Sequence, residues 1–542
     1  MRSQDIRERF LDFFTNRGHE RLPSSSLIPL DDPSLLFTSA GMVPLKPYIL
    51  GARSLPGNRA TSCQKCFRAD DVEEVGDDVH HTFFEMLGNW SFGDYFKGEA
   101  IELAWELLTR DLGLDARRLV PSVYPDDSEA EDVWVHRIGI PRSRVSRVMD
   151  NWWQAGPTGP CGYDSEIYWD RGSPCSCGRD DCLPQDECGG GRWSEIWNLV
   201  FMEFDQDGSG GRTPLPRPCV DTGMGLERMA AVLQEVGGNY DTDLLRPLVD
   251  GFERRSSADR ERPGDVVALR VLADHLRAGA FLIGDGVIPD NEGRGYVLRR
   301  VVRRASLFGR RIALAEGLAG GVADLGAVMG IAYPEIAEHR ALIEDTLRRE
   351  EAAFERTLGA GLERLERLLG AGGSRLSGED AFRLHDTHGF PADLTVELAR
   401  ERGVEVDMDG FRAAMEEQRR KSQGAATAVP GWSAVAPDHP TAFVGYDSLE
   451  AESVAVHVRG PAGTAEIAAG ERGEVVLDPT PFYAEGGGQV GDHGVVRWAG
   501  GCGDVVDTQA AGAAARATRV STVEVREGVL RAGERVHATV DA

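Results

Sequence analysis

Three patterns of hydrophobic and polar residues follow one another along the chain. Up to about residue 245, short apolar runs typical of strands, such as 193–207, alternate with helical patterns such as 1–18 and 101–113. From about 246 to 430, apolar residues recur every three or four positions, which predicts packed amphipathic helices. After a stretch rich in Pro, Gly and Ala, the period becomes two, which predicts the strands of a small β-barrel.

These patterns predict three domains in a chain of 542 residues, which is long enough for each to bury its own core. Residues 1–245 are expected to form an α/β domain on an antiparallel sheet, and residues 246–430 a helical domain. A linker at 431–440 would lead to the barrel at 441–542.

Composition indicates a compartment. No apolar run reaches 18 residues, so no transmembrane helix is expected. The first 18 residues have the pattern of a capped amphipathic helix and not of a signal peptide. We therefore expect a cytoplasmic protein without a membrane partner.

The net charge of −28 argues against a general nucleic-acid binder, because contacts with phosphate need Lys and Arg. It does not exclude an enzyme that holds one RNA through a local basic face. Residues 298–311 predict such a face, since they contain six Arg and no acid. At helical spacing, Arg299, Arg303 and Arg310 lie near one side, and Val301, Val302 and Leu307 face another. The alternative is a solvated helix whose arginines pair with acids elsewhere.

Four of the nine cysteines form a cluster, Cys175-x-Cys177-x4-Cys182-x5-Cys188, in an insertion at 171–192. A cytosolic chain does not group thiols in this way for disulfides. Four thiolates within fourteen residues suit a tetrahedral structural Zn²⁺. The alternative is a reduced, Gly-rich surface loop.

Residues 80–96, HHTFFEMLGNWSFGDYF, combine five Phe or Trp with two adjacent His, a mixture that neither a simple amphipathic helix nor an alternating strand requires. Arg68 ends a β-prone stretch upstream, and CVDTGMGLERMA (219–230) lies far downstream, where a strand runs through Gly223 into a helix with Arg228. Together these segments resemble motifs two and three of the class II aminoacyl-tRNA synthetases, and in detail the alanyl-tRNA synthetases. The resemblance spans nearly the whole chain.

The resemblance implies that ATP and L-alanine are joined in one pocket, with Mg²⁺ bridging the phosphates. Activation of a carboxylate relies mainly on positioning and electrostatics, for which bidentate, permanently charged arginines are well suited. Arg68 would bind the α-phosphate, Arg228 the γ-phosphate, and Asp221 the ammonium group of alanine. The implied nucleotide-binding residues are Arg68, His80, His81, Phe84, Met86 and Arg228. The implied alanine-binding residues are Trp153, Asn198, Val200, Asp221 and Gly223.

The segments 289–305 and 382–395 resemble the tRNA-recognition domain of the same family. By analogy, Asn291 and Asp393 would read a G·U pair in the acceptor stem, and Arg299 and Arg303 would contact the tRNA. A-form RNA exposes base edges in a wide minor groove, where the wobble leaves the guanine amino group unpaired. The structural alternatives are a turn residue for Asn291 and an acid at a helix N-terminus for Asp393.

Residues 480–494 resemble the start of the family's editing module, but the chain contains no His-x-x-x-His pair. A small pocket separates amino acids that differ by a methyl group by only about 1–3 kcal/mol. We therefore expect a monomeric, specialised paralogue that charges tRNA without editing. Two other functions remain open: an adenylate-forming enzyme that passes alanine to an acceptor other than tRNA, and a non-catalytic RNA-binding homologue.

Overall fold

The computed structural model describes residues 1–29, 32, 35–155, 158–172, 175–179, 181–186, 188, 191–370, 374–388, 390–426, 441–445, 448–484, 492–511 and 518–541. The chain divides into two compact units, Met1–Met408 and Asp409–Ala542. The predicted linker at 431–440 lies outside the described residues.

The first unit is built on a nine-stranded sheet, in the order β1-β2-β3-β9-β8-β7-β4-β5, with β6 paired to β7. The strands are β1 (Glu20–Arg21), β2 (Arg59–Phe67), β3 (Phe83–Phe92), β4 (Leu119–Val123), β5 (Ser146–Arg147), β6 (Trp152–Gln154), β7 (Gly159–Asp170), β8 (Trp193–Gln206) and β9 (Arg212–Gly225).

The sheet is mixed, which corrects the prediction of an antiparallel one. The pairs β1–β2 and β4–β5 at its edges are parallel, whereas the central pairs are antiparallel. Parallel neighbours need a crossover connection, and helix α4 (Ser128–Asp132) lies between β4 and β5. Short edge strands of this kind carry too few residues to show in a hydrophobic pattern.

Helices cover the sheet and share one hydrophobic core with it. Helix α1 (Ser3–Thr15) contacts β2, β3 and α5 (Leu226–Leu233), and α3 (Lys97–Glu106) contacts β8. The rings of Phe10 on α1 and Trp197 on β8 lie 5.5 Å apart. The periodic stretch 101–113 ends in a π-helical turn, Leu107–Asp111, instead of one continuous α-helix.

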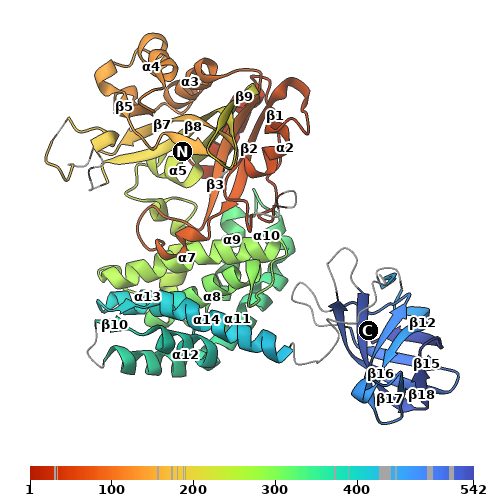
Figure 1. Ribbon diagram of the computed structural model, residues 1–542. Coiled ribbons are helices and arrows are strands. Elements are labelled where there is room, and N and C mark those ends of the chain that lie inside the picture. The colour runs from red at the N-terminus through yellow and green to blue at the C-terminus, as the bar shows by residue number, and fades with distance from the viewer. Residues whose placement is uncertain are drawn as a thin grey trace. The chain divides into compact units, whose positions relative to one another are not determined.

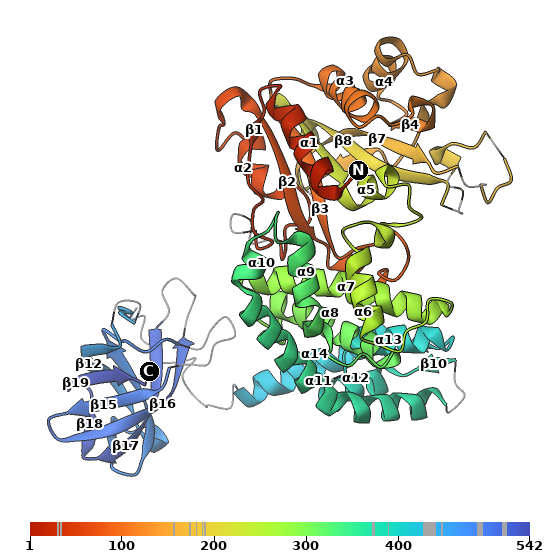
Figure 2. The same ribbon diagram turned by 180° about the vertical axis from the view of Figure 1, so that it is seen from behind.

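The remaining helices of the first unit lie beyond residue 245: α6 (Arg246–Arg254), α7 (Pro263–Gly284), α8 (Gly293–Arg311), α9 (Val322–Met329), α10 (Glu335–Glu338), α11 (Arg340–Leu369), α12 (Gly378–His388) and α13 (Ala392–Glu401). In Figures 1 and 2, α7 lies next to the sheet, with α8 and α12 on its far side. The ring of Phe281 on α7 stacks on Phe83 of β3, with centroids 4.2 Å apart. A domain boundary at residue 245 stays a prediction.

The second unit contains α14 (Met408–Ala426) and the predicted barrel (Figure 1). The barrel is closed in the order β12-β14-β17-β16-β15-β19. Its strands are β12 (Glu450–Arg459), β14 (Arg472–Asp478), β15 (Gly494–Trp498), β16 (Gly501–Ala511), β17 (Thr518–Glu527) and β19 (Arg535–Val540), and β13 (Glu466–Ala468) pairs separately with β18 (Val529–Arg531). Alternate residues such as Val475, Val496 and Val523 fill the interior.

Across the described parts of both units, no helix has the length and apolar character needed to cross a membrane.

Candidate nucleotide and amino-acid site

All six residues expected to bind the nucleotide line one cavity of about 120 Å³. They come from the end of β2, the loop before β3, β3 itself and the start of α5, and they are Arg68, His80, His81, Phe84, Met86 and Arg228. The alternation of β3 decides which side chains face the cavity: Phe84 and Met86 are half-buried on that side, while Phe83 and Glu85 are buried on the other.

The two arginines enter the cavity from segments 160 residues apart in sequence. The backbone N–H of Arg68 donates to Thr82 O at 2.9 Å, and its guanidinium lies 4.9 Å from the ring centroid of Phe84. Nη1 of Arg228 donates to both the carbonyl and the carboxylate of Glu195, each at 3.0 Å. Contacts with neighbouring residues thus orient both guanidinium groups, and both residues also line the cavity. This arrangement suits the binding of anionic phosphates.

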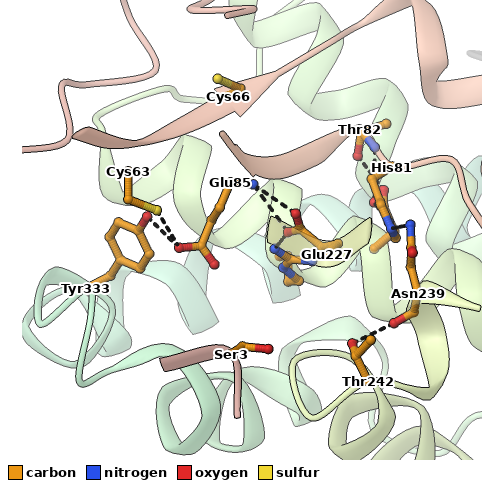
Figure 3. Close-up of polar contacts among 12 residues, drawn as sticks. Ser3, Cys63, Cys66, His81, Thr82, Glu85, Glu227, Asn239, Thr242 and Tyr333 are labelled. Atoms are coloured by element: carbon orange, nitrogen blue, oxygen red, sulfur yellow. Dashed lines mark hydrogen bonds and ion pairs between the residues drawn. The ribbon is translucent and has the colours of Figure 1, made fainter. Parts of the chain in front are cut away.

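The two adjacent histidines have different surroundings. His80 is more exposed, and its Nδ1 lies 2.5 Å from an oxygen of Asp77. His81 is buried, with its Nε2 3.0 Å from the side-chain nitrogen of Asn239 and its Nδ1 3.5 Å from Asp274 (Figure 3). Only His80 can therefore reorient easily when a ligand enters.

Behind β3 lies a buried polar network that sequence reasoning missed (Figure 3). Glu85 accepts from the guanidinium of Arg7 at 2.8 and 2.9 Å and from the hydroxyl of Tyr333 at 2.8 Å. The backbone N–H of Glu85 donates to the carboxylate of Glu227 at 3.2 Å, and Glu227 in turn pairs with Arg277 of α7. The only signal in the sequence was a single acid inside an apolar strand.

The expected ammonium ligand, Asp221, is buried on β9. The indole N–H of Trp90 donates to it at 2.5 Å, and burial raises the pKa of Asp221 to about 7. Val200 pairs with Asp221 across β8 and β9, and it packs in one apolar cluster with Trp90 and the partly buried Trp153.

The cavity and the expected alanine pocket overlap at one residue only. Among the described residues that line the cavity, Gly223 is the single member of the alanine set. A Cβ on Gly223 would lie 2.8 Å from the sulfur of Met86, so a side chain here would press on the cavity wall. Asp221 precedes Gly223 by two residues on the same face of β9, which places its carboxyl group next to the cavity wall.

Asn198 lies among acids that the sequence analysis did not single out. Its amide nitrogen donates to Asp164 at 2.7 Å and to Glu166 at 3.4 Å. Burial and the charge of Glu166 raise the pKa of Asp164 to about 7, and burial with the charge of Glu195 raises the pKa of Glu166. For Asn198 to contact a substrate carboxylate, its amide group would therefore have to break its hydrogen bond with Asp164 or Glu166. The available signal in the sequence was the pair Asp164 and Glu166, two residues apart in one strand, together with Glu195 in the next strand.

The four predicted zinc ligands come together. The sulfur atoms of Cys175, Cys177, Cys182 and Cys188 all lie within 4.8 Å of one another. Tetrahedral coordination with bonds of about 2.3 Å separates sulfur atoms by about 3.8 Å, so the cluster fits Zn²⁺ with small adjustments. The cluster could bind zinc.

The basic face at 298–311 is neutralised in this structure. Its helix is α8, and Val301 and Val302 are buried as the pattern predicts. The six arginines all pair with acids: Arg299 and Arg303 with Glu350, Arg300 with Glu73 and Asp393, Arg304 with Glu397, Arg310 with Glu355 and Arg311 with Glu401. The alternative left open by the sequence, arginines paired with distant acids, therefore describes the chain in the absence of RNA.

The two expected G·U readers are both held by arginines of α8. Arg299 donates to the side-chain oxygen of Asn291, and Nε of Arg300 lies 2.9 Å from Asp393. Asp393 is in the first turn of α13, as its structural alternative predicts. Asn291 is exposed and Asp393 is partly exposed, and the side chains of both contact α8.

Comparison with known proteins agrees with these motifs. The profile of the family "tRNA synthetases class II (A)" matches residues 5–542. Alanine–tRNA ligases are 49% identical in Delftia acidovorans (93% of this chain, 59% of that one) and 46% identical in Methylococcus capsulatus (100% and 63%). A solved pyrrolysyl-tRNA synthetase from Desulfitobacterium hafniense covers 44% of this chain and 72% of its own at 11% identity, and its TM-score of 0.26 carries no argument.

The chain spans about 60% of the length of these curated relatives. The match nevertheless extends over nearly all of its own residues and includes every motif described above. The resemblance found in the sequence is thereby confirmed, and the chain belongs to the class II tRNA synthetases, in the family of the alanine–tRNA ligases.

Proposed function

We propose that this chain joins L-alanine to ATP as alanyl-adenylate and transfers the alanyl group to the 3′ end of tRNA(Ala). The observation that carries the proposal is the placement of Arg68 and Arg228 on one cavity, with Asp221 on the strand beside it. The names of the relatives support the same reaction. Nothing in the site favours an acceptor other than tRNA, and the presence of Arg68, Asp221 and Arg228 disfavours a non-catalytic homologue.

In the first step, a carboxylate oxygen of alanine attacks the α-phosphorus. The bond from the α-phosphorus to the bridging oxygen breaks, and pyrophosphate leaves with its electron pair. Arg68 stabilises the charge on the α-phosphate and Arg228 holds the γ-phosphate of a bent nucleotide. His80, His81, Phe84 and Met86 would bound the base and sugar. In the second step, a terminal ribose hydroxyl of the tRNA attacks the alanyl carbonyl carbon and AMP leaves.

The amino acid would bind at the end of the cavity nearest Gly223. Asp221 takes the ammonium group, and a side chain at 223 would press Met86 into this end of the cavity. Val200 and Trp153 supply an apolar wall for the methyl group. Asn198 is proposed to contact the carboxylate after release from Asp164 or Glu166.

Mg²⁺ and Zn²⁺ have separate proposed places. Glu166 and Glu195 lie beside Arg228, and carboxylate oxygens together with nucleotide phosphates are the ligands that Mg²⁺ prefers. Bound there, Mg²⁺ would neutralise part of the phosphate charge. Zn²⁺ would be held by the four cysteine sulfurs and would stiffen the insertion.

The helices between 246 and 430 are proposed to form the tRNA-recognition domain, with Asn291 and Asp393 reading a G·U pair. Arg299 and Arg303 would support this contact by orienting Asn291 and by exchanging Glu350 for phosphate. The barrel at 441–542 is proposed to be a separate domain. A monomer in the cytoplasm stays a prediction.

The test is ATP–pyrophosphate exchange with a panel of amino acids, followed by charging of tRNA transcripts. We expect exchange with alanine above all others and charging that depends on the G·U pair. Exchange that does not respond to alanine would refute the amino-acid assignment. Exchange without tRNA charging would instead favour another acceptor.

A further inference from the structure

Two arginines of α8 connect the proposed RNA reader to the segment that follows Arg68. Arg300 lies 2.9 Å from Asp393 of α13 and 2.6 Å from Glu73. One helical turn further on, Arg304 lies 2.8 Å from Glu397 of α13 and donates to the carbonyl of Val75 at 3.0 Å. We call this pair, Arg300 and Arg304, the arginine clamp.

A second, fully buried path leads from the clamp to the start of β3. Nη1 of Arg304 lies 3.2 Å from Nε2 of His275, whose Nδ1 is 2.9 Å from the carboxylate of Asp274. Asp274 accepts from the backbone N–H of Thr82 at 3.0 Å and from its hydroxyl.

Thr82 then completes the path to the nucleotide cavity. Its carbonyl accepts the backbone N–H of Arg68 at 2.9 Å, and its neighbour His81 lines the cavity. Both paths therefore end on the chain that positions Arg68: one on residues 73–75 just after it, the other on the strand end that holds its backbone.

We propose that the arginine clamp couples recognition of the acceptor stem at Asp393 to the position of Arg68, and that Arg300 and Glu73 are positioning residues for the transfer reaction. The inference rests on the proposed function, because it takes Asp393 to be the group that binds the guanine amino group.

The physical step is competition for one carboxylate. In the structure, Arg300 shares its charge between Asp393 and Glu73, both partly exposed. An RNA amino group that binds Asp393 takes part of that carboxylate's hydrogen-bonding capacity, so Arg300 interacts more strongly with Glu73. The segment after Arg68 then moves toward α8. Arg304, which is 4% exposed and held by three groups, keeps the helix in place during this exchange.

A coupling of this kind predicts an effect on rate that is separate from RNA affinity. Glu73→Gln removes the negative charge of the second partner of Arg300 without touching the cavity or Asp393. We expect single-turnover transfer to a G·U transcript to fall relative to a G·C transcript by about 10-fold. The KM for the G·U transcript should change by less than about twofold, and tRNA-independent pyrophosphate exchange should stay at the wild-type rate.

Glu355→Gln is the matched control, because it breaks the pair with Arg310 on the same helix and touches nothing near Arg68. It should leave the discrimination between transcripts unchanged. Arg300→Lys, which keeps the charge but cannot span both acids, should lose discrimination as Glu73→Gln does. Thermal unfolding of each variant reports whether it folds.

The outcomes separate the two proposals. Equal charging of both transcripts by the wild-type enzyme would refute the reading of G·U, and the clamp with it. Wild-type discrimination that survives unchanged in Glu73→Gln and Arg300→Lys would overturn the clamp alone. If Asp393→Asn and Glu73→Gln each lose discrimination and the double variant loses no more, both act on one path.

Discussion

At the scale of single residues, Asp221 shows how a binding group can weaken the fold that carries it. The carboxyl group is buried, with the indole of Trp90 as its hydrogen-bond donor. Because burial disfavours the charged form, its pKa rises to about 7. An ammonium group placed beside it would restore the charge and lower the pKa again. The cost of burying this carboxylate is thus highest in the empty pocket, and the bound substrate reduces it.

This gives a pH-dependent prediction for Asp221→Asn. Between about pH 4 and 7 the unfolded chain loses the Asp221 proton while the folded chain keeps it, so rising pH destabilises the wild type. The amide does not titrate, and we expect the variant to gain roughly 2 to 4 kcal/mol over the wild type between pH 5 and pH 8. Its alanine-dependent exchange should fall at least about 100-fold, because the amide cannot pair with the ammonium group, and the loss of one partner of a buried charge pair costs about 3–5 kcal/mol.

Urea unfolding of both proteins at the two pH values measures the effect. A stability difference that is the same at pH 5 and pH 8 would show that Asp221 titrates normally in the folded chain.

At the scale of elements, the insertion between β7 and β8 has an ion pair at its base and four cysteines in its described residues. Asp170 closes the base through its ion pair with Arg192 at 2.9 Å. Cys175 and Cys182 are buried, although the insertion offers little apolar surface of its own. The four cysteine sulfurs gathered at its centre are therefore the main candidates for holding the loop together.

We predict roughly one zinc per wild-type chain and its loss in Cys182→Ser, as measured by elemental analysis. Limited proteolysis within 171–192 should become faster in the variant and in chelator-treated wild type. Cys502→Ser on β16 is the control, because this half-buried cysteine lies outside the cluster. A wild-type protein that holds no zinc, or a Cys182→Ser protein that retains it, would show that the cluster is a reduced surface loop.

The elements also show what a sequence can and cannot predict. Period-two alternation was enough for the barrel strands, a short apolar run was enough for β8, and the helical pattern was enough for the buried side of α8. Clustering of the nucleotide residues followed from motif resemblance. The partners of the α8 arginines could not be predicted, because Glu350 and Glu397 lie 47 and 93 residues away in sequence. Ion pairs carry no periodic signal, so only the folded chain shows that the basic face is neutralised.

At the scale of the whole first unit, Glu85 joins its most distant segments. It binds Arg7 of the N-terminal helix and Tyr333 between α9 and α10, 248 residues further along the chain than Glu85 itself. Burial alone would lower the pKa of Arg7, but the charge of Glu85 raises it, so the cation persists in the core. Such a pair adds little by itself, yet the loss of one partner leaves a buried charge without its counterpart. The same strand carries Phe84 and Met86 on its cavity side, so the network also supports the site.

Glu85→Gln keeps the shape of the side chain and removes its charge, which leaves a guanidinium that is 7% exposed without a counter-ion. We expect the free energy of unfolding of Met1–Met408 to fall by about 3 to 5 kcal/mol in chemical denaturation. The matched control is Glu8→Gln, which breaks an ion pair with Arg21 whose side chains are 41% and 45% exposed. That change should cost no more than about 1 kcal/mol. Equal losses in the two variants would mean that water reaches Arg7 and that the network does not hold the unit together.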